Sequence, residues 1–162
     1  MKYLLIITCF LFVTLAHGQI GYKQLLLSGG LSLSNSKLLT VQYEGAGVHK
    51  IHAGVLLQTI WYSNDENAHY SLKSNTIYGA AGLYLKGDMH TSKNFSATWH
   101  LGGACGTNTH EVIIYPFGGL DQGWYICPKT QLFVSENVIY VVISSIMNTW
   151  KPYIGAGLKF SL

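Results

Sequence analysis

The sequence predicts an all-β protein, an eight-stranded antiparallel up-and-down β-barrel of the outer-membrane type. The chain is rich in glycine and tyrosine, with 18 and 11 residues, and only 10% of its residues are charged. Segments of about ten residues alternate between apolar side chains and polar or small ones, as in strands that turn one face toward lipid. The chain ends on such a segment, residues 151–162, whose apolar face carries Ile154, Ala156, Leu158, Phe160 and Leu162.

The amino-terminal residues have the order of features of a secretory signal peptide. Lys2 precedes an apolar run at residues 3–15, and small residues follow up to Gly18. The run is too short to cross a hydrocarbon layer of ~30 Å as a helix. We therefore expect residues 1–18 to be a signal peptide, cleaved between Gly18 and Gln19, and residues 19–162 to form a single barrel domain.

Period-two alternation divides the mature chain into eight strands. The expected strands are residues 22–33, 39–47, 51–62, 75–85, 95–105, 123–134, 138–147 and 151–162, and the short run 112–115 is assigned to a loop. If both chain ends face the periplasm, the outer connections are 34–38, 63–74, 106–122 and 148–151. The inner turns are then 48–50, 86–94 and 135–137, which are mostly shorter, as in outer-membrane barrels.

Aromatic residues near the strand ends predict two girdles at the membrane interfaces. We expect Trp61, Trp124 and Trp150 at the outer rim, and Tyr84, Phe133 and Phe160 at the inner rim. A soluble barrel whose aromatic residues cap its core is the alternative.

The other face of the strands is polar or small, which predicts a lumen filled by the protein's own side chains. Eight strands leave an interior just wide enough for side chains, so we expect no solute channel. The expected lumen residues are Thr40, Gln42, Glu44, Ser96, Thr98, His100, Gly155 and Gly157.

The sequence gives little support for nucleic-acid, metal or cofactor binding. The formal net charge is +3, and the cations are scattered lysines without any arginine, whereas base and phosphate recognition relies on clustered basic residues. His49 and His52 are three residues apart, which places them on opposite faces of a strand, and no Cys or acidic residue completes a metal site. Outer-membrane lipid is the expected surrounding, and no cofactor or metal is expected.

Cys105 and Cys127 are the only cysteines after the signal peptide. An oxidising periplasm permits a disulfide between them. Their faces argue against it, because Cys105 lies on the apolar face of its strand and Cys127 on the more polar face of its own, whereas cross-strand partners point the same way. A bulge would reverse this parity, so a possible disulfide stays open.

One pair of residues, His69 and Ser71, could belong to a hydrolytic active site. His69 and Ser71 lie in the connection 63–74, near Asp65 and Glu66, and some small outer-membrane barrels act on lipid A through Ser and His. A serine nucleophile needs its base held at hydrogen-bond distance by a third group. We expect no enzymatic activity, with a barrel lipid A hydrolase as an alternative.

Four glycine-rich segments carry a resemblance to a known family. They are Gly29-Gly30, the segment 77–85 (IYGAAGLYL), the segment 97–106 with Leu101-Gly-Gly103, and the closing segment 153–160 (YIGAGLKF). Over residues 27–162 the chain resembles the TraO family, small exported proteins of Bacteroides-type conjugative transposons.

The resemblance implies an outer-membrane barrel that supports conjugative DNA transfer. It would act through contacts with other envelope or conjugation-apparatus proteins, without touching DNA or catalysing a reaction. The alternative is a generic small surface barrel whose connections 63–74 and 106–122 bind cell-surface or host partners. The expected location is the outer membrane, with the periplasm second, and the sequence leaves the partner and the oligomeric state open.

Overall fold

The computed structural model describes residues 23–32, 36–45, 50–62, 76–108, 112–143 and 149–162. These residues form eight strands: β1 (Gln24–Ser32), β2 (Lys37–Glu44), β3 (Ile51–Tyr62), β4 (Thr76–Thr91), β5 (Phe95–Thr107), β6 (Val112–Cys127), β7 (Thr130–Ile143) and β8 (Thr149–Ser161). Each strand pairs antiparallel with the next, and β8 pairs with β1, so the sheet is a closed barrel. The predicted eight-stranded up-and-down barrel is therefore confirmed.

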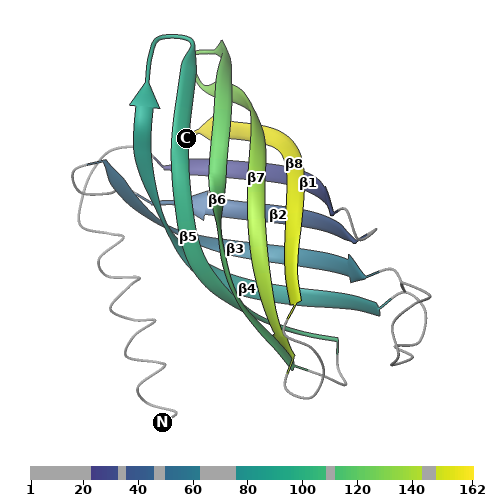
Figure 1. Cartoon of the computed structure of the whole chain (residues 1–162). Coiled ribbons are helices and arrows are strands. Elements are labelled where there is room, and N and C mark those ends of the chain that lie inside the picture. Colours follow the sequence, from purple (N-terminus) through teal and green to yellow (C-terminus); the bar gives the residue numbers. More distant parts are fainter. Residues whose placement is uncertain (1–22, 33–35, 46–49, 63–75, 109–111, 144–148) are drawn as a thin grey trace.

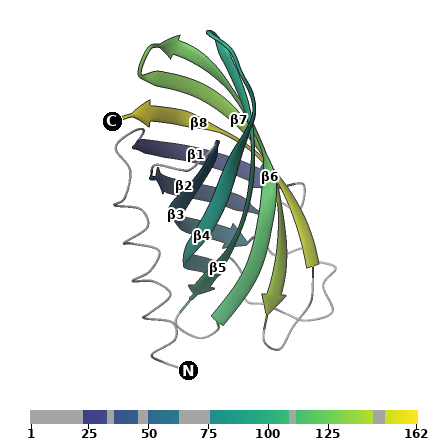
Figure 2. The ribbon, with the colours of Figure 1, turned by 90° about the vertical axis from the view of Figure 1, so that its left-hand side faces the viewer.

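The strands are tilted, as closure of a sheet into a barrel requires. Figure 1 and Figure 2 show β1, β2 and β3 running at a steep angle to β6 and β7. Within the described ranges, no helix is long and apolar enough to cross a membrane.

The two ends of the barrel differ in what they carry. Gln24 at the start of β1 pairs with Ser161 at the end of β8, so both strands place their outermost residues at one end, here called the terminal end. The β2–β3, β4–β5 and β6–β7 connections also lie there (Figure 1). The remaining connections, β1–β2, β3–β4, β5–β6 and β7–β8, lie at the opposite end, here called the loop end.

The last strand closes the barrel in the register that its alternation predicts. Leu27 pairs with Leu158 and Ser28 with Gly157, so apolar residues meet on the outer face and small ones on the inner face. A one-residue slip would reverse every side chain, which explains why a strict period of two specifies this seam.

The wall of the barrel is apolar on the outside. Large hydrophobic side chains are exposed along every strand, among them Leu31, Leu39, Leu57, Ile77, Leu101, Ile114, Leu132 and Ile154. Charged and polar residues such as Glu44, Lys86, Thr98, His100 and Asp121 are instead buried inside. This is the reverse of the polarity of a water-soluble barrel and the arrangement expected of one surrounded by lipid.

The boundaries of β6 and β7 correct the sequence analysis. The run 112–115, assigned to a loop, begins the 16-residue strand β6, and the expected strand 123–134 is interrupted by the turn between Cys127 and Thr130. The expected turn 135–137 lies inside β7. Pro116 and Gly118-Gly119 resembled loop residues, yet all three lie within β6, where the alternation of buried and exposed residues continues around them.

Strand β4 is also longer than expected. It continues to Thr91, so most of the expected turn 86–94 is strand, and the reversal uses only residues 92–94. Three hydrogen bonds close this turn. The backbone N–H and the hydroxyl of Ser92 both donate to the Phe95 carbonyl oxygen, and the Phe95 backbone N–H donates to Ser92 Oγ. The expected outer connection 106–122 shrinks in the same way to residues 108–111, and 63–74 lies outside the described residues.

Candidate functional site

The polar residues of the barrel interior gather in the half nearer the terminal end. Thr40, Glu44, Ser96, Thr98 and His100 are buried there, as the sequence predicted for lumen residues. They come from β2 and β5, and buried polar side chains of β4, β6 and β7 lie beside them. The interior therefore contains a polar zone that the outer wall lacks.

An ion network crosses this zone. The Lys86 ammonium on β4 lies 2.9 Å from Glu44 Oε1 on β2 and 2.8 Å from Asp121 Oδ2 on β6. All three side chains are buried, and a buried charge is strongly unfavourable unless it is paired and hydrogen-bonded. Lys86 thus links strands on opposite walls of the barrel through its two carboxylate partners.

Glu44 has a second partner in Tyr84. The Tyr84 hydroxyl donates a hydrogen bond of 3.1 Å to Glu44 Oε1, the same oxygen that Lys86 contacts. Gly54 makes room for the Tyr84 ring, because a Cβ at this position would lie 2.5 Å from its Cζ atom. A glycine on β3 therefore sets where the tyrosine of β4 can lie.

Asp121 is held from the other side by β5 and β7. The Ser135 hydroxyl donates a hydrogen bond of 2.5 Å to Asp121 Oδ1, and His100 Nδ1 lies 3.5 Å from the same oxygen. Asn137 donates to Ser135 Oγ over 2.7 Å, and its side-chain oxygen contacts His100 Nε2.

The arrangement of Ser135, His100 and Asp121 differs from that of a catalytic triad. In a triad the serine hydroxyl bonds to the histidine and the carboxylate orients the opposite ring nitrogen. Here the Ser135 hydroxyl bonds to the carboxylate instead, and the second ring nitrogen of His100 faces Asn137. The group satisfies buried polar atoms without joining a nucleophile to a base.

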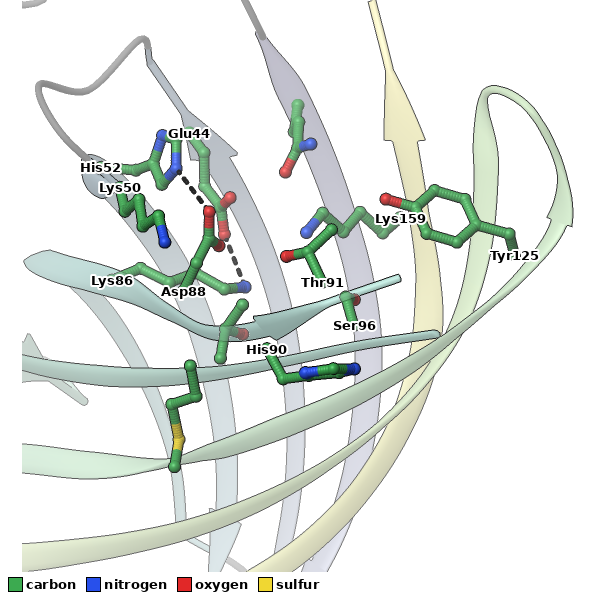
Figure 3. A pocket seen from close by; sticks show the side chains of 13 residues that line it. Glu44, Lys50, His52, Lys86, Asp88, His90, Thr91, Ser96, Tyr125 and Lys159 are labelled. Carbon is green, nitrogen blue, oxygen red and sulfur yellow. Dashed lines mark hydrogen bonds and ion pairs between the residues drawn. The ribbon is translucent and has the colours of Figure 1, made fainter. Parts of the chain in front are cut away.

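A cavity of about 430 Å³ lies between this network and the terminal end. Figure 3 shows Lys159 reaching into it from β8 and Tyr125 from β6, with His52, Asp88 and Lys50 on the other side. His52 Nε2 lies 3.7 Å from Asp88 Oδ2, and both side chains are partly exposed. The cavity lining combines cations and anions, with Lys86 and Glu44 at its inner wall.

The half of the interior toward the loop end is filled by apolar and aromatic side chains. Tyr115 is fully buried, and its hydroxyl donates to Gln58 Oε1 over 2.6 Å at the boundary with the polar zone. We call this filling the apolar plug; it comprises Leu38, Leu56, Ile60, Tyr78, Ala80, Ala104, Ile113, Tyr115, Ile139, Val141 and Tyr153. The cavity therefore does not continue as a channel through the described part of the barrel.

The predicted girdle residues divide into three groups. Trp61 and Trp150 lie near the loop end, as predicted for an outer rim, and the Trp150 ring packs on Tyr140 with centroids 4.5 Å apart. Phe160 is on the outer face near the terminal end, paired with Leu25. Contact of these three with a membrane interface stays a prediction.

The other three girdle positions are wrong. Trp124 lies at the terminal end, packed on Phe95, because it is near the end of β6, whereas it is near the start of the expected strand 123–134. Tyr84 and Phe133 are only 4% and 3% exposed and face the interior. Tyr84 has the inward parity of Lys86, and Phe133 that of Gln131 and Ser135, so the inward set of each strand includes aromatic as well as polar residues.

The possible disulfide is also wrong. Cys105 and Cys127 are both free. Cys105 pairs with Ile114 near the loop end, whereas Cys127 pairs with Thr130 at the terminal end, so the barrel separates them along nearly its full height.

Several other predicted sites lie outside the described residues. They are the signal cleavage site at Gly18 and Gln19, the histidine His49, and the pair His69 and Ser71 with Asp65 and Glu66. Among the residues that the structure does describe, no group of three His, Cys, Asp or Glu side chains is placed to hold a metal ion.

Sequence reasoning missed Lys86 and Asp121, the two residues that complete the ion network. The expected connections 86–94 and 106–122 contain Lys86 and Asp121, respectively. The signal that could have identified them is parity: Lys86 follows Tyr84 by two residues, and Asp121 continues the inward series of Ile113, Tyr115 and Phe117.

No protein-family model and no curated protein sequence matches the chain. Among solved structures, it is similar to a de novo designed transmembrane β-barrel, with a TM-score of 0.64 and 12% identity over 89% of this chain and 98% of that one. It is also similar to the N-terminal barrel domain of Pseudomonas aeruginosa OprF (TM-score 0.62, 11% identity, 87% and 97% covered). Neisserial surface protein A is a third (TM-score 0.55, 11% identity, 87% and 96% covered). The chain thus has the closed eight-stranded fold of small outer-membrane barrels.

Proposed function

We propose that the protein is a non-catalytic outer-membrane barrel that supports conjugative DNA transfer through contacts with other envelope proteins. The observation that carries the membrane part is the apolar outer wall of every strand, which stands opposite an interior that holds the buried charged residues. A barrel of this polarity is stabilised by lipid, because exposed apolar side chains on every strand are then removed from water.

The conjugative part rests on the resemblance of the glycine-rich strands to the TraO family. The interior supports a scaffold role over transport, since the apolar plug fills one half and the ion network crosses the other. It also supports a non-catalytic role, because Ser135 bonds to the Asp121 carboxylate rather than to His100. The surfaces left for function are the outer wall and the two ends of the barrel.

The first test is cell fractionation combined with a denaturing gel run with and without boiling. We expect recovery with the outer membrane and a heat-dependent change in mobility, because a closed barrel resists detergent until it is heated. Recovery in the soluble periplasmic fraction with unchanged mobility would contradict membrane insertion.

The second test is the frequency of conjugative transfer from donors that lack the gene. We expect transfer to fall at least about tenfold and to recover when the gene is supplied on a plasmid, with donor growth unchanged as the control. Unchanged transfer from donors whose barrel is missing would contradict the conjugative role and leave a surface barrel that binds other partners.

A further inference from the structure

One lysine of the barrel interior lacks a partner. Lys159 on β8 points inward, and its neighbours across the sheet, Leu26 and Gln131, are both buried. Its ammonium makes no hydrogen bond or ion pair with any described residue, whereas each charged residue of the ion network is paired. A charge held inside the barrel without a partner is unfavourable, so a group of opposite charge that reaches it is bound favourably.

Lys159 lies where such a group can enter from outside. Figure 3 shows its side chain extending from β8 into the cavity at the terminal end. The cavity, of about 430 Å³, is within the size range of small-ligand sites, and Lys86 and Glu44 form its inner wall. Four hydroxyl groups line the same cavity and can donate hydrogen bonds; they belong to Thr91, Ser96, Thr98 and Tyr125.

The two carboxylates that line the cavity already have partners. Glu44 contacts both Lys86 and the Tyr84 hydroxyl through Oε1. Asp88 Oδ2 has His52 Nε2 at 3.7 Å. The charge left for a ligand is therefore positive, and the ligand that matches it is an anion.

The charge of the surrounding region also favours an anion. Among the described residues, the interior and the terminal end together carry six lysines and three acidic residues, a difference of three positive charges. The acidic residues are those of the ion network and Asp88, and the lysines are Lys23, Lys50, Lys86, Lys93, Lys129 and Lys159. A cleft lined mainly by one sign of charge raises the local concentration of solutes of the opposite sign.

We propose that the cavity at the terminal end binds a small organic monocarboxylate. Its carboxylate accepts a hydrogen bond from the Lys159 ammonium and others from the hydroxyl groups of the cavity wall. One negative charge fits better than two, because Glu44 and Asp88 line the same cavity and repel the second charge of a phosphate dianion. This binding site goes beyond the proposed scaffold role and does not depend on it.

The first measurement is the binding of fluorobenzoate to the mature chain in detergent micelles, followed by fluorine NMR. Fluorobenzamide has nearly the same size and no charge, so it is the matched probe, and empty micelles show how much of each probe the detergent takes up. We expect fluorobenzoate to bind at least about tenfold more tightly than the amide, because only the carboxylate forms charge-assisted hydrogen bonds. Equal affinities of the two probes would overturn the site.

The second measurement repeats the titration with variants of Lys159. We expect Lys159→Met to raise the dissociation constant of fluorobenzoate by about tenfold or more. Lys159→Arg retains the charge and is expected to keep most of the affinity, and Lys129→Met, at the exposed β6–β7 turn, is the control that should leave it unchanged. If Lys159 only balances the carboxylates of the ion network, Lys159→Met will lower stability in urea without changing the affinity, and that result would overturn the proposal.

Competition with acetate and with inorganic phosphate tests the class of ligand, in a buffer in which phosphate is mostly a dianion. We expect acetate to displace fluorobenzoate at lower concentrations than phosphate does, and the reverse order would rule out the monocarboxylate. A heat-dependent gel shift checks the fold of each variant, and if Lys159→Met does not fold, the two probes on the wild-type chain still decide. A wild-type chain recovered as a soluble, unshifted protein contradicts the membrane barrel, whereas a folded barrel that does not bind fluorobenzoate overturns the site alone.

Discussion

Lys86 stabilises the two buried carboxylates of the interior, Glu44 and Asp121, by forming an ion pair with each of them. It lies between Glu44 and Asp121 and is the only cation within 3 Å of either among the described ion pairs. Removing one partner of a buried ion network leaves the others uncompensated, which is more damaging than never having had the network. The stability of the barrel should therefore depend on the balance of these charges more than on their number.

We expect Lys86→Met to lower the free energy of unfolding by about 3–5 kcal/mol, because two buried carboxylates then lose their cation. Urea unfolding in detergent micelles, followed by tryptophan fluorescence, measures the change. Lys129→Met at the exposed β6–β7 turn is the control and should change stability by less than about 0.5 kcal/mol. Recovery is expected when Glu44→Gln and Asp121→Asn are added, and a Lys86→Met protein as stable as the control would refute the charge argument.

Gly54 should be intolerant of any side chain because the Tyr84 ring occupies the space where a Cβ would lie. We expect Gly54→Ala to cost about 1–3 kcal/mol through displacement of the ring and weakening of its hydrogen bond to Glu44. Gly79→Ala is the matched control, because a Cβ there meets nothing within 4 Å. The same urea titration compares them, and equal stability of the two variants would show that Tyr84 moves aside without cost.

For single residues, the sequence predicts correctly which side chains face the lumen only where it also predicts the strand correctly. Thr98 and His100 were predicted in the lumen because β5 alternates without interruption, and both are buried there. Lys86 and Asp121 were not, since a buried lysine or aspartate depends on partners from other strands. Local pattern contains no information about those partners until the register of the whole barrel is known.

Each strand has an outward face, and the free-energy cost of a charged residue on that face depends on its depth in the membrane. In β3, Leu57 lies mid-strand and Ile51 at the terminal end, and both are exposed on the same face. Lysine on the lipid face costs about 2–4 kcal/mol at the midplane and about 0–1 kcal/mol near an interface. The two positions therefore test the membrane setting within one strand.

We expect Leu57→Lys to reduce the stability of the barrel in phospholipid vesicles by about 2–4 kcal/mol and Ile51→Lys by about 1 kcal/mol or less. Reversible folding into vesicles from urea measures both. If the two variants lose the same stability, the belt is not centred where the strands indicate.

The boundaries of the elements were harder to predict than their number. The strands of the first half were found because their alternation is bounded by polar, glycine-containing segments. In β6, however, Pro116, Gly118 and Gly119 resemble loop residues without ending the strand. The β6–β7 pairing is interrupted at Tyr115 and Pro116, resumes at Phe117 and continues through both glycines. The Pro128-Lys129 turn was overlooked because strong strand formers flank it on both sides.

For the molecule as a whole, the interior is divided between an apolar plug and a polar zone with a cavity. The cavity belongs to the terminal end, and the plug separates it from the loop end. In the part of the barrel that the structure describes, the plug therefore lies between the cavity and the loop end. This division follows from the inward residues of all eight strands together, and no one strand predicts it.

We expect the wild-type barrel to show no ion conductance above baseline in planar lipid bilayers. Tyr115→Ala combined with Ile139→Ala removes two buried members of the plug and should produce discrete conductance steps. Thr98→Ala, a truncation in the polar zone, is the control and should remain silent, provided that all three proteins show the heat-dependent gel shift. Conductance of the wild-type protein would contradict the plug.

The apolar outer wall also bears on how the chain reaches its final state. A barrel completed in water would expose large side chains such as Leu31, Leu57 and Ile154 over its whole circumference, and such particles aggregate. Closure in water would leave this surface exposed, because these side chains point away from the interior. Closing the seam between β1 and β8 therefore leaves the apolar wall exposed in water, whereas surrounding lipid removes that wall from water.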